Sequence, residues 1–212
     1  MEVDQLRQFR SARPCDAPGA YRVCLLTGDA GEDASDRYDN PDLLGHTYVG
    51  PYLTADADLN LVVVDAEGVC GYLLATADTT RFERWRAAEW LPALQAQYPI
   101  GSGSTRDAEL TGLLHHPPSS PPELVADHPA HLHIDLLPRA QGQGWGRRLM
   151  DHVAAALRAR GVPGVHLGVS PDNARARGFY ARLGYRELQR GDDVIYLGLR
   201  LTGDDPNPRP HP

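Results

Sequence analysis

Apolar positions in the second half of the chain fall into short runs and into stripes with a spacing of three or four residues. The short runs predict β-strands at 132–137, 165–170, 185–190 and 194–201. The stripes predict helices at 144–160 and 174–183, each with one apolar face toward a sheet. Strands that alternate with helices in this order predict a mixed α/β fold.

The pattern near the N-terminus is weaker. Residues 1–19 are polar and rich in Arg and Pro, and we expect them to form a poorly ordered, flexible leader. The apolar run 21–27 predicts a first strand. Residues 28–53 have the composition of helical pieces that break at Pro41 and Pro51, because proline cannot continue a helix.

A hairpin and a helix complete the first half. Two β-rich runs, 59–65 and 69–77, are joined by a short connection that predicts a hairpin. Residues 80–97 have helical spacing with a break or kink at Pro92. Residues 98–130 are dense in Gly, Ser and Pro and longer than an ordinary connection, so we interpret them as an insertion that forms a lid or a partner surface.

Length and composition favour one domain. The 212 residues, 42% of them hydrophobic, can bury a single core, which we assign to 20–201, with a disordered Pro-rich tail at 202–212. No apolar run reaches the ~18 residues of a membrane span and no signal-peptide core is present, so we expect a cytoplasmic protein without a membrane partner. The three cysteines are widely spaced, which indicates neither a disulfide framework nor a metal site.

Charge is unevenly distributed. Residues 139–186 hold nine arginines against Asp151 and Asp172, a balance of +7, and because the whole chain carries −7, the remainder carries −14. The basic part would attract phosphate groups. The acidic remainder argues against nucleic acid as a partner and would draw a cationic amine.

The most informative stretch is Gln-Gly-Gln-Gly-Trp-Gly at 141–146, between a predicted strand and a predicted helix. The first amides of a helix lack intrahelical partners and favour an anion, and glycines let the main chain approach a phosphate closely. The chain contains no Lys, which excludes a P-loop, and the glycine spacing does not fit the Rossmann fingerprint. The stretch therefore predicts a phosphate site of another kind.

Two sequence blocks carry a family resemblance. Segment 141–146 fits Q/R-x-x-G-x-G/A, and segment 173–185 fits N-x-x-A-x-x-F-Y-x-x-x-G-F/Y; together they resemble the cofactor signature of the GNAT acyltransferases. The resemblance implies acetyl-CoA or CoA as cofactor, and a mixed, mostly antiparallel sheet of about six or seven strands, covered by helices on both faces and splayed at the cofactor strand. The cofactor-binding residues that it implies are Leu136, Leu137, Gln141, Gly142, Gln143, Gly144, Trp145, Gly146, Arg147, Asn173 and Tyr180.

Most of the chain also resembles a narrower group, the acetyltransferase-like C-terminal domain of O-GlcNAc hydrolase (O-GlcNAcase). The likeness extends over about 21–201 and is carried by 41–45, 68–72, 90–92, 97–99 and 133–180. This sequence contains no hydrolase domain, so the resemblance implies a free-standing bacterial relative. Its glycine loop is intact, whereas that of the eukaryotic domain is degenerate.

The resemblance and the strand pattern together suggest catalytic groups. The family places a tyrosine hydroxyl near the thioester sulfur, which makes Tyr180 the candidate proton donor; a half-buried core aromatic is the alternative. The two-residue period of strand 132–137 puts His131, His133 and Asp135 on one face, which is unusual for an interior strand. Asp135 and His133 are candidate bases for an ammonium substrate, the alternatives being a loop anchor and a structural histidine.

We therefore expect an acetyl-CoA-dependent N-acetyltransferase that moves the acetyl group directly to a primary amine, either a small molecule or a protein lysine. No cysteine lies in either cofactor block, which argues against an acyl-enzyme. We expect a monomer or a homodimer. The alternatives are a catalytically silent acetyl-CoA-binding module and a protein-interaction module that uses the insertion.

Overall fold

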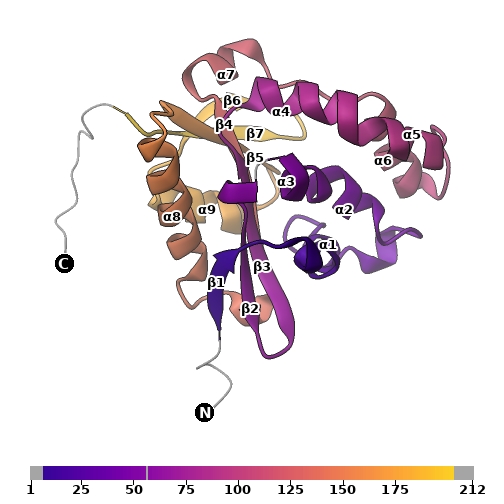
Figure 1. The fold of residues 1–212 in the computed structure, drawn as a ribbon, viewed down its shortest axis with the longest axis horizontal. Coiled ribbons are helices and arrows are strands. Elements are labelled where there is room, and N and C mark those ends of the chain that lie inside the picture. The colour runs from indigo at the N-terminus through magenta and orange to yellow at the C-terminus, as the bar shows by residue number, and fades with distance from the viewer. Residues whose placement is uncertain (1–6, 56, 203–212) are drawn as a thin grey trace.

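The computed structural model describes residues 7–55 and 57–202, and seven of its strands form one sheet (Figure 1). In sheet order the strands are β1 (Gln8–Ser11), β2 (Leu61–Asp65), β3 (Gly68–Thr76), β4 (Ala130–Leu136), β5 (Gly164–Val169), β7 (Ile195–Arg200) and β6 (Arg186–Arg190). All neighbours pair antiparallel except β4 and β5, which run parallel. The expectation of a mixed, mostly antiparallel sheet is confirmed.

Helices cover both faces of the sheet. They are α1 (Ala17–Leu25), α2 (Leu43–Tyr48), α3 (Gly50–Ala55), α4 (Thr79–Trp85), α5 (Leu91–Gln97), α6 (Thr105–His115), α7 (Pro122–Asp127), α8 (Trp145–Ala159) and α9 (Ala174–Arg182). In Figure 1, α8 and α9 lie on one side of the sheet and α1 to α6 on the other. None of the helices within the described ranges has the length and apolar character that crossing a membrane requires.

One hydrophobic core extends from Ala20 to Leu201. The stripe predicted for the helix after the glycine loop is buried in α8, where Leu149 and Leu157 are 0% exposed. α8 lies over β3 and β4, and this packing places its N-terminus next to the end of β4. The predicted hairpin and every element predicted from residue 132 onward are confirmed, with boundaries within two residues.

The prediction of a strand at 21–27 is wrong, because this segment lies largely in α1. Ala20, Val23 and Cys24 are buried at steps of three and one, which is the spacing of one helix face. A short apolar run fits a strand and a buried helix equally well, and here packing against β3 decides for the helix.

The prediction of a poorly ordered leader is wrong for residues 7–19. They hold β1, a 3-10 turn at Pro14–Asp16 and the start of α1. The guanidinium of Arg10 in β1 donates to both carboxylate oxygens of Asp16, at 2.6 and 2.8 Å, which ties the strand to the turn. Residues 1–6 of that leader, and the tail beyond Thr202, lie outside the described residues.

The insertion at 98–130 contains α6 and α7. Ser104 caps α6 by accepting a hydrogen bond from the amide of Asp107 at 3.4 Å, and α6 packs against α2 and α5. The break or kink predicted at Pro92 is a π-turn at Arg86–Trp90, directly before α5, and the chain stays helical through this proline, which lies in the first turn of α5. A role of the insertion as a lid or partner surface stays a prediction.

Candidate active site

The sheet opens between β4 and β5. These strands pair only at Ala130↔Val165 and His131↔His166. Beyond these pairs they diverge, and β4 stays paired with β3 while β5 stays paired with β7. A cleft of about 910 Å³ occupies the opening and continues between the two halves of the chain. The splay that the family resemblance implied is therefore present.

The backbone of β4 presents unpaired groups to this opening. The amide of Leu137 donates to the Cys70 carbonyl at 2.9 Å. In an antiparallel pair, alternate residues bond to the neighbouring strand, so the backbone groups of Asp135 and His133 also face β3, and those of the residues between them face away from it. Ile134 and Leu136 therefore direct their N–H and C=O groups toward the cleft. The Leu136 carbonyl accepts from Gln141 Nε2 at 2.7 Å, and its N–H faces the opening, whereas the amide of Leu137 is engaged in the sheet.

The glycine loop borders the same cleft. Gly142 (φ 75°) and Gly144 (φ 81°) are left-handed, and an added Cβ at either would have nothing within 4 Å. α8 begins at Trp145, so its first amides lie at the cleft without intrahelical acceptors. Gly146 is packed closely, because an added Cβ would lie 3.1 Å from the ring of Phe179, tighter than an ordinary contact.

Most of the residues predicted to bind the cofactor come together here. Leu137 and Gln143 do not line the cleft, and the side chain of Gln143 turns away from it. The predicted residues that line it are Leu136, Gln141, Gly142, Gly144, Trp145, Gly146, Arg147, Asn173 and Tyr180.

α9 supplies Asn173 and Tyr180. The Asn173 side chain accepts a hydrogen bond from the Ala176 amide at 2.9 Å and so caps the helix, as its position before a helical run predicted. Tyr180 lies two turns later on the same side and is 7% exposed. Burial, with a contribution from the charge of Asp135, raises the pKa of Tyr180, so its hydroxyl is protonated throughout the physiological range.

Asp135 faces the cleft from the polar side of β4. The hydroxyl of Tyr72, its cross-strand neighbour on β3, donates to Asp135 Oδ2 at 2.5 Å, and Thr27 lies beside it. Burial raises the pKa of Asp135, although the hydrogen bonds from Tyr72 and Thr27 oppose the shift. A carboxylate with a raised pKa binds a proton more strongly than an exposed one and is a better base.

The two histidines on this face differ. The Thr79 hydroxyl donates its proton to the Pro129 carbonyl at 2.7 Å, so the Thr79 oxygen can only accept from His131 Nδ1, at 2.8 Å. With the proton on Nδ1, His131 Nε2 accepts from the Tyr52 hydroxyl at 2.5 Å. His131 is therefore a structural residue. His133 lines the cleft, but burial and the nearby Arg86 lower its pKa to about 4, so it is neutral and weakly basic at neutral pH.

Sequence reasoning missed one wall of the cleft. Tyr72, Thr27 and the loop 28–32 line it, and Arg175 and Arg182, which were missed as well, line the cleft from α9. The loop turns tightly at Ala30 (φ 52°) and Gly31 (φ 100°), where the backbones of Asp29 and Glu32 exchange hydrogen bonds of 3.0 and 2.9 Å. The Gly-Asp-Ala-Gly-Glu sequence carried this turn signal, but nothing local linked it to α9.

Charge is separated across the cleft. Asp29, Glu32 and Asp135 lie on the walls formed by the first half and β4, whereas Arg147, Arg175 and Arg182, with Asp172 beside them, lie on the walls formed by α8, α9 and the turn before α9. The Arg175 guanidinium donates to Gln141 Oε1 and so joins α9 to the glycine loop. The basic side suits phosphate, and the acidic side suits a cation.

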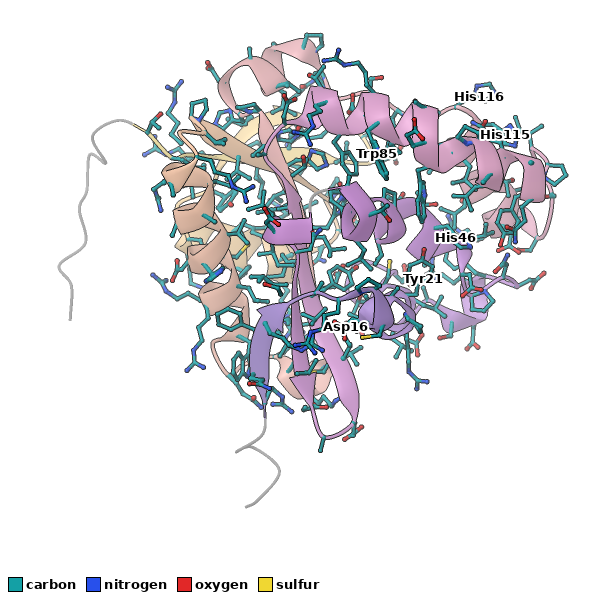
Figure 2. The ribbon with its side chains drawn as sticks, viewed as in Figure 1. Asp16, Tyr21, His46, Trp85, His115 and His116 are labelled. Carbon is teal, nitrogen blue, oxygen red and sulfur yellow. The ribbon has the colours of Figure 1, made fainter. Side chains whose placement is uncertain are left out.

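His115 is the last residue of α6 and His116 follows it, at the right-hand edge of the molecule in Figure 2. His115 Nε2 bonds to the Tyr98 carbonyl at 2.9 Å. Across residues 7–55 and 57–202, no three His, Cys, Asp or Glu side chains are grouped so that they could hold a metal ion.

Comparisons with known proteins agree with this geometry. A model of the acetyltransferase (GNAT) family matches residues 65–185. The chain is 30% identical to protein O-GlcNAcase of Rattus norvegicus over 196 residues, which is 89% of this chain but 21% of that protein, so it spans about a fifth of the curated relative's length.

Solved structures share the fold. The crystal structure of SsHAT matches with a TM-score of 0.87 and 40% identity, covering 93% of this chain and 100% of that one. The yncA protein of Salmonella typhimurium, solved with its cofactor acetyl-CoA, matches with a TM-score of 0.55 and 16% identity, covering 94% of this chain and 96% of that one. The chain belongs to the acetyltransferase (GNAT) family.

Proposed function

We propose that this protein is a cytoplasmic N-acetyltransferase that moves an acetyl group from acetyl-CoA directly to a primary amine. Membership of the family supports acetyl-CoA-dependent acetyl transfer in general. The observation that carries the finer proposal is that one cleft holds the glycine loop, the open edge of β4, Tyr180 and Asp135. The three cysteines are unpaired in the structure, which fits a reducing compartment.

The cleft fits the proposed cofactor. Its volume of about 910 Å³ suits a large ligand, and the open space over Gly142 and Gly144 lets a diphosphate reach the first amides of α8. Bound acetyl-CoA would supply a thioester-activated acetyl group. Arg147 and Arg175 would balance the phosphate charge, and Asn173 would lie beside the ligand.

The main chain of β4 would polarise the reacting carbonyl. The Leu136 N–H points into the opening, where a fixed donor stabilises negative charge that develops on an oxygen. This donor is held rigidly, because Gln141 Nε2 bonds to the carbonyl of the same residue at 2.7 Å.

Tyr180 and Asp135 would move the two protons. A substrate ammonium must lose a proton before its nitrogen can attack, and Asp135, with its raised pKa, is placed to take it. Tyr180 is protonated and would donate to the departing thiolate sulfur, and the proton that the nitrogen loses as the amide forms would return to the Tyr180 oxygen. His133, with a pKa of about 4, is the weaker base and would instead shape the acceptor side of the cleft.

The acceptor would be a primary amine that is positively charged before it reacts. Glu32 and Asp135 line the cleft and favour such a cation over an anionic or neutral acceptor, whereas the charge of Asp29 is balanced by Arg37 at 2.5 Å. A small-molecule amine and a protein lysine both have this chemistry.

An amine panel tests the proposal. The full chain is incubated with acetyl-CoA and with polyamines, aminoglycosides and lysine peptides, while release of free thiol and acetylated product are measured. Thiol release that depends on the amine and matches product formation supports the proposal. Acetyl-CoA binding without acetylation of any amine above the hydrolysis background contradicts it.

A further inference from the structure

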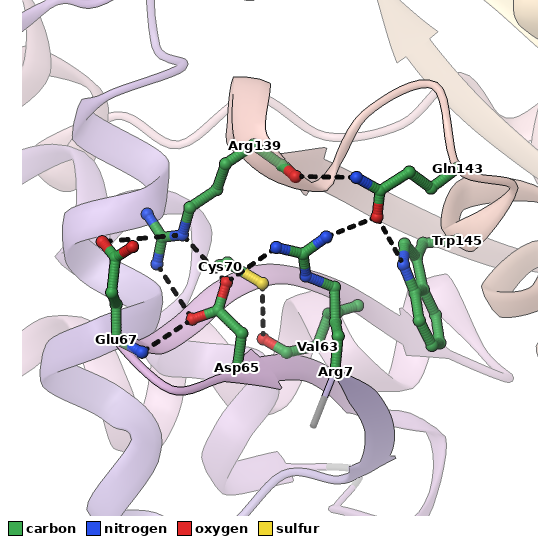
Figure 3. Close-up of polar contacts among 8 residues, drawn as sticks. All are labelled: Arg7, Val63, Asp65, Glu67, Cys70, Arg139, Gln143 and Trp145. Carbon is green, nitrogen blue, oxygen red and sulfur yellow. Dashed lines mark hydrogen bonds and ion pairs between the residues drawn. The ribbon is translucent and has the colours of Figure 1, made fainter. Parts of the chain in front are cut away.

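A buried ion-pair network lies behind the glycine loop (Figure 3). Asp65, at the end of β2, binds Arg7 NH2 at 3.1 Å and Arg139 Nε at 2.9 Å. The side chains of Asp65 and Arg7 are only 2% and 6% exposed. In the described part of the chain, neither they nor Arg139 line the cleft.

Gln143 connects this network to the loop. It lies between the left-handed Gly142 and Gly144, and its side chain points outward (Figure 3). Its Oε1 accepts from the Arg7 guanidinium and from Trp145 Nε1 (3.3 Å), and its Nε2 donates to the Arg139 carbonyl (3.3 Å). These bonds hold the Gln143 side chain on the surface of the loop that faces away from the cleft. The opposite surface of the loop, formed by the glycines, therefore faces the cleft.

Asp65 is the charge on which the network depends. Burial alone would raise its pKa, but hydrogen bonds from Arg139 and Arg7 outweigh burial and lower the pKa of Asp65 to about 2. The carboxylate is therefore ionised at neutral pH. Without it, Arg7 and Arg139 would lose the carboxylate that they share, and Glu67, 3.9 Å from Arg139 and 70% exposed, would hold Arg139 only weakly.

We propose that Asp65 is a positioning residue for the cofactor loop. By holding Arg139 directly, and Gln143 through Arg7, it keeps residues 139–145 in the conformation whose amides face the cleft. This role rests on the proposed cofactor site, but it does not depend on which amine is acetylated or on whether transfer occurs.

The size of the effect follows from the loop population. If only the ordered loop binds the cofactor, the apparent Kd rises in inverse proportion to the fraction of molecules whose loop is ordered. Loss of Asp65 that leaves about a tenth of the molecules ordered raises the Kd for acetyl-CoA about tenfold. Bound cofactor restores the order, so kcat at saturating acetyl-CoA stays within about twofold of the wild type.

The chain contains a matched control. Arg10 and Asp16 form a similar ion pair, at 2.6 Å with side chains 28% and 7% exposed, and Arg10 lies in β1 three residues after Arg7. This pair fastens β1 to the turn before α1 and does not contact the loop. The Asp65→Asn and Arg7→Met variants are therefore compared with Asp16→Asn and Arg10→Met.

Calorimetry with acetyl-CoA, thermal unfolding and steady-state kinetics on the full chain test the proposal. We expect Asp65→Asn and Arg7→Met to raise the Kd and the KM for acetyl-CoA about tenfold. The control pair should lower the melting temperature with the Kd changed less than about twofold. If Asp65→Asn does not fold, the Kd of Arg7→Met for acetyl-CoA tests the positioning role instead.

Two results would overturn the positioning role: wild-type affinity in the Asp65→Asn and Arg7→Met variants, or the same loss of affinity in the control pair. A wild-type protein that binds no acetyl-CoA overturns it together with the proposed function. A wild type that binds acetyl-CoA but acetylates no amine contradicts only the proposed function, and the Kd comparison still decides the role of Asp65.

Discussion

Replacing Gly144 by alanine should weaken cofactor binding much more than it weakens the fold. Gly144 has φ 81°, and a Cβ built there meets nothing within 4 Å, so the alanine has no steric conflict with the rest of the protein. The penalty is the backbone conformation itself, which costs a non-glycine residue about 1–2 kcal/mol. The strain is relieved when the loop leaves the left-handed conformation and turns its amides away from the cleft.

This strain can be converted into affinity. If the competent loop is disfavoured by about 1–2 kcal/mol, the apparent Kd for acetyl-CoA rises about 5- to 30-fold. Calorimetric titration measures the Kd, and urea unfolding of the same variant measures the stability, which should fall by no more than about 2 kcal/mol.

Gly161 is the matched control for this change. It follows the other end of α8 with φ 71°, and an added Cβ there also meets nothing within 4 Å. Gly161→Ala should therefore cost the same strain while changing the Kd less than about twofold. Wild-type affinity in Gly144→Ala, or equal weakening in Gly161→Ala, would show that the left-handed conformation at Gly144 does not control cofactor binding.

Substitutions at three further residues, with their controls, test the other roles. Tyr180→Phe should lower kcat about 100-fold or more with little change in the Kd for acetyl-CoA. Tyr185→Phe, the same change at a neighbouring buried ring, should leave kcat close to that of the wild type. Equal losses of kcat in the two variants would contradict a proton-donor role for Tyr180. Asp135→Asn should abolish most turnover without lowering stability at pH 7. The folded pKa of Asp135 is raised, so its contribution to stability is fully present below the unfolded pKa and is lost as the pH rises through the folded one. Other titrating groups, His133 among them, are common to both proteins, so urea unfolding from pH 4 to 8 should show the free energy of unfolding of the wild type falling relative to that of the variant as the pH rises. Asn173→Ala should cost about 1 kcal/mol through the lost helix cap, and Asn173→Asp should keep the cap but weaken acetyl-CoA binding; unchanged binding in Asn173→Asp would place the cofactor away from α9.

The second half of the fold was predictable because its signals are local. The apolar stripe of α8 fits only one period, and the glycine spacing at 142 and 144 matches the two left-handed residues of the loop. The cap formed by Asn173 depends on residues three apart, so a short window of sequence contains it.

The missed features depend on contacts that are distant in sequence. β1 is a polar edge strand, recognisable only through its pairing with β2 more than fifty residues later. Segment 21–27 has apolar residues at both strand and helix spacing, and β3 resolves the ambiguity. The bond from Tyr72 to Asp135 requires the register of β3 and β4, since neither residue is unusual in its local sequence.

Sequence patterns placed the polar face of β4 correctly but could not rank its members. His131, His133 and Asp135 share that face as predicted, opposite Thr76, Leu74 and Tyr72. Their differences come from neighbours on other elements, which occupy both nitrogens of His131 and lower the pKa of His133 to about 4.

The most direct test of the central claim is a backbone amide NMR titration of the full chain with acetyl-CoA. We expect the amides of Gly142, Gly144 and Gly146 to shift most, together with the Leu136 amide at the open edge of β4, and all of them to saturate with one Kd. Saturable shifts confined to other parts of the surface, or no shifts at saturating acetyl-CoA, would contradict it.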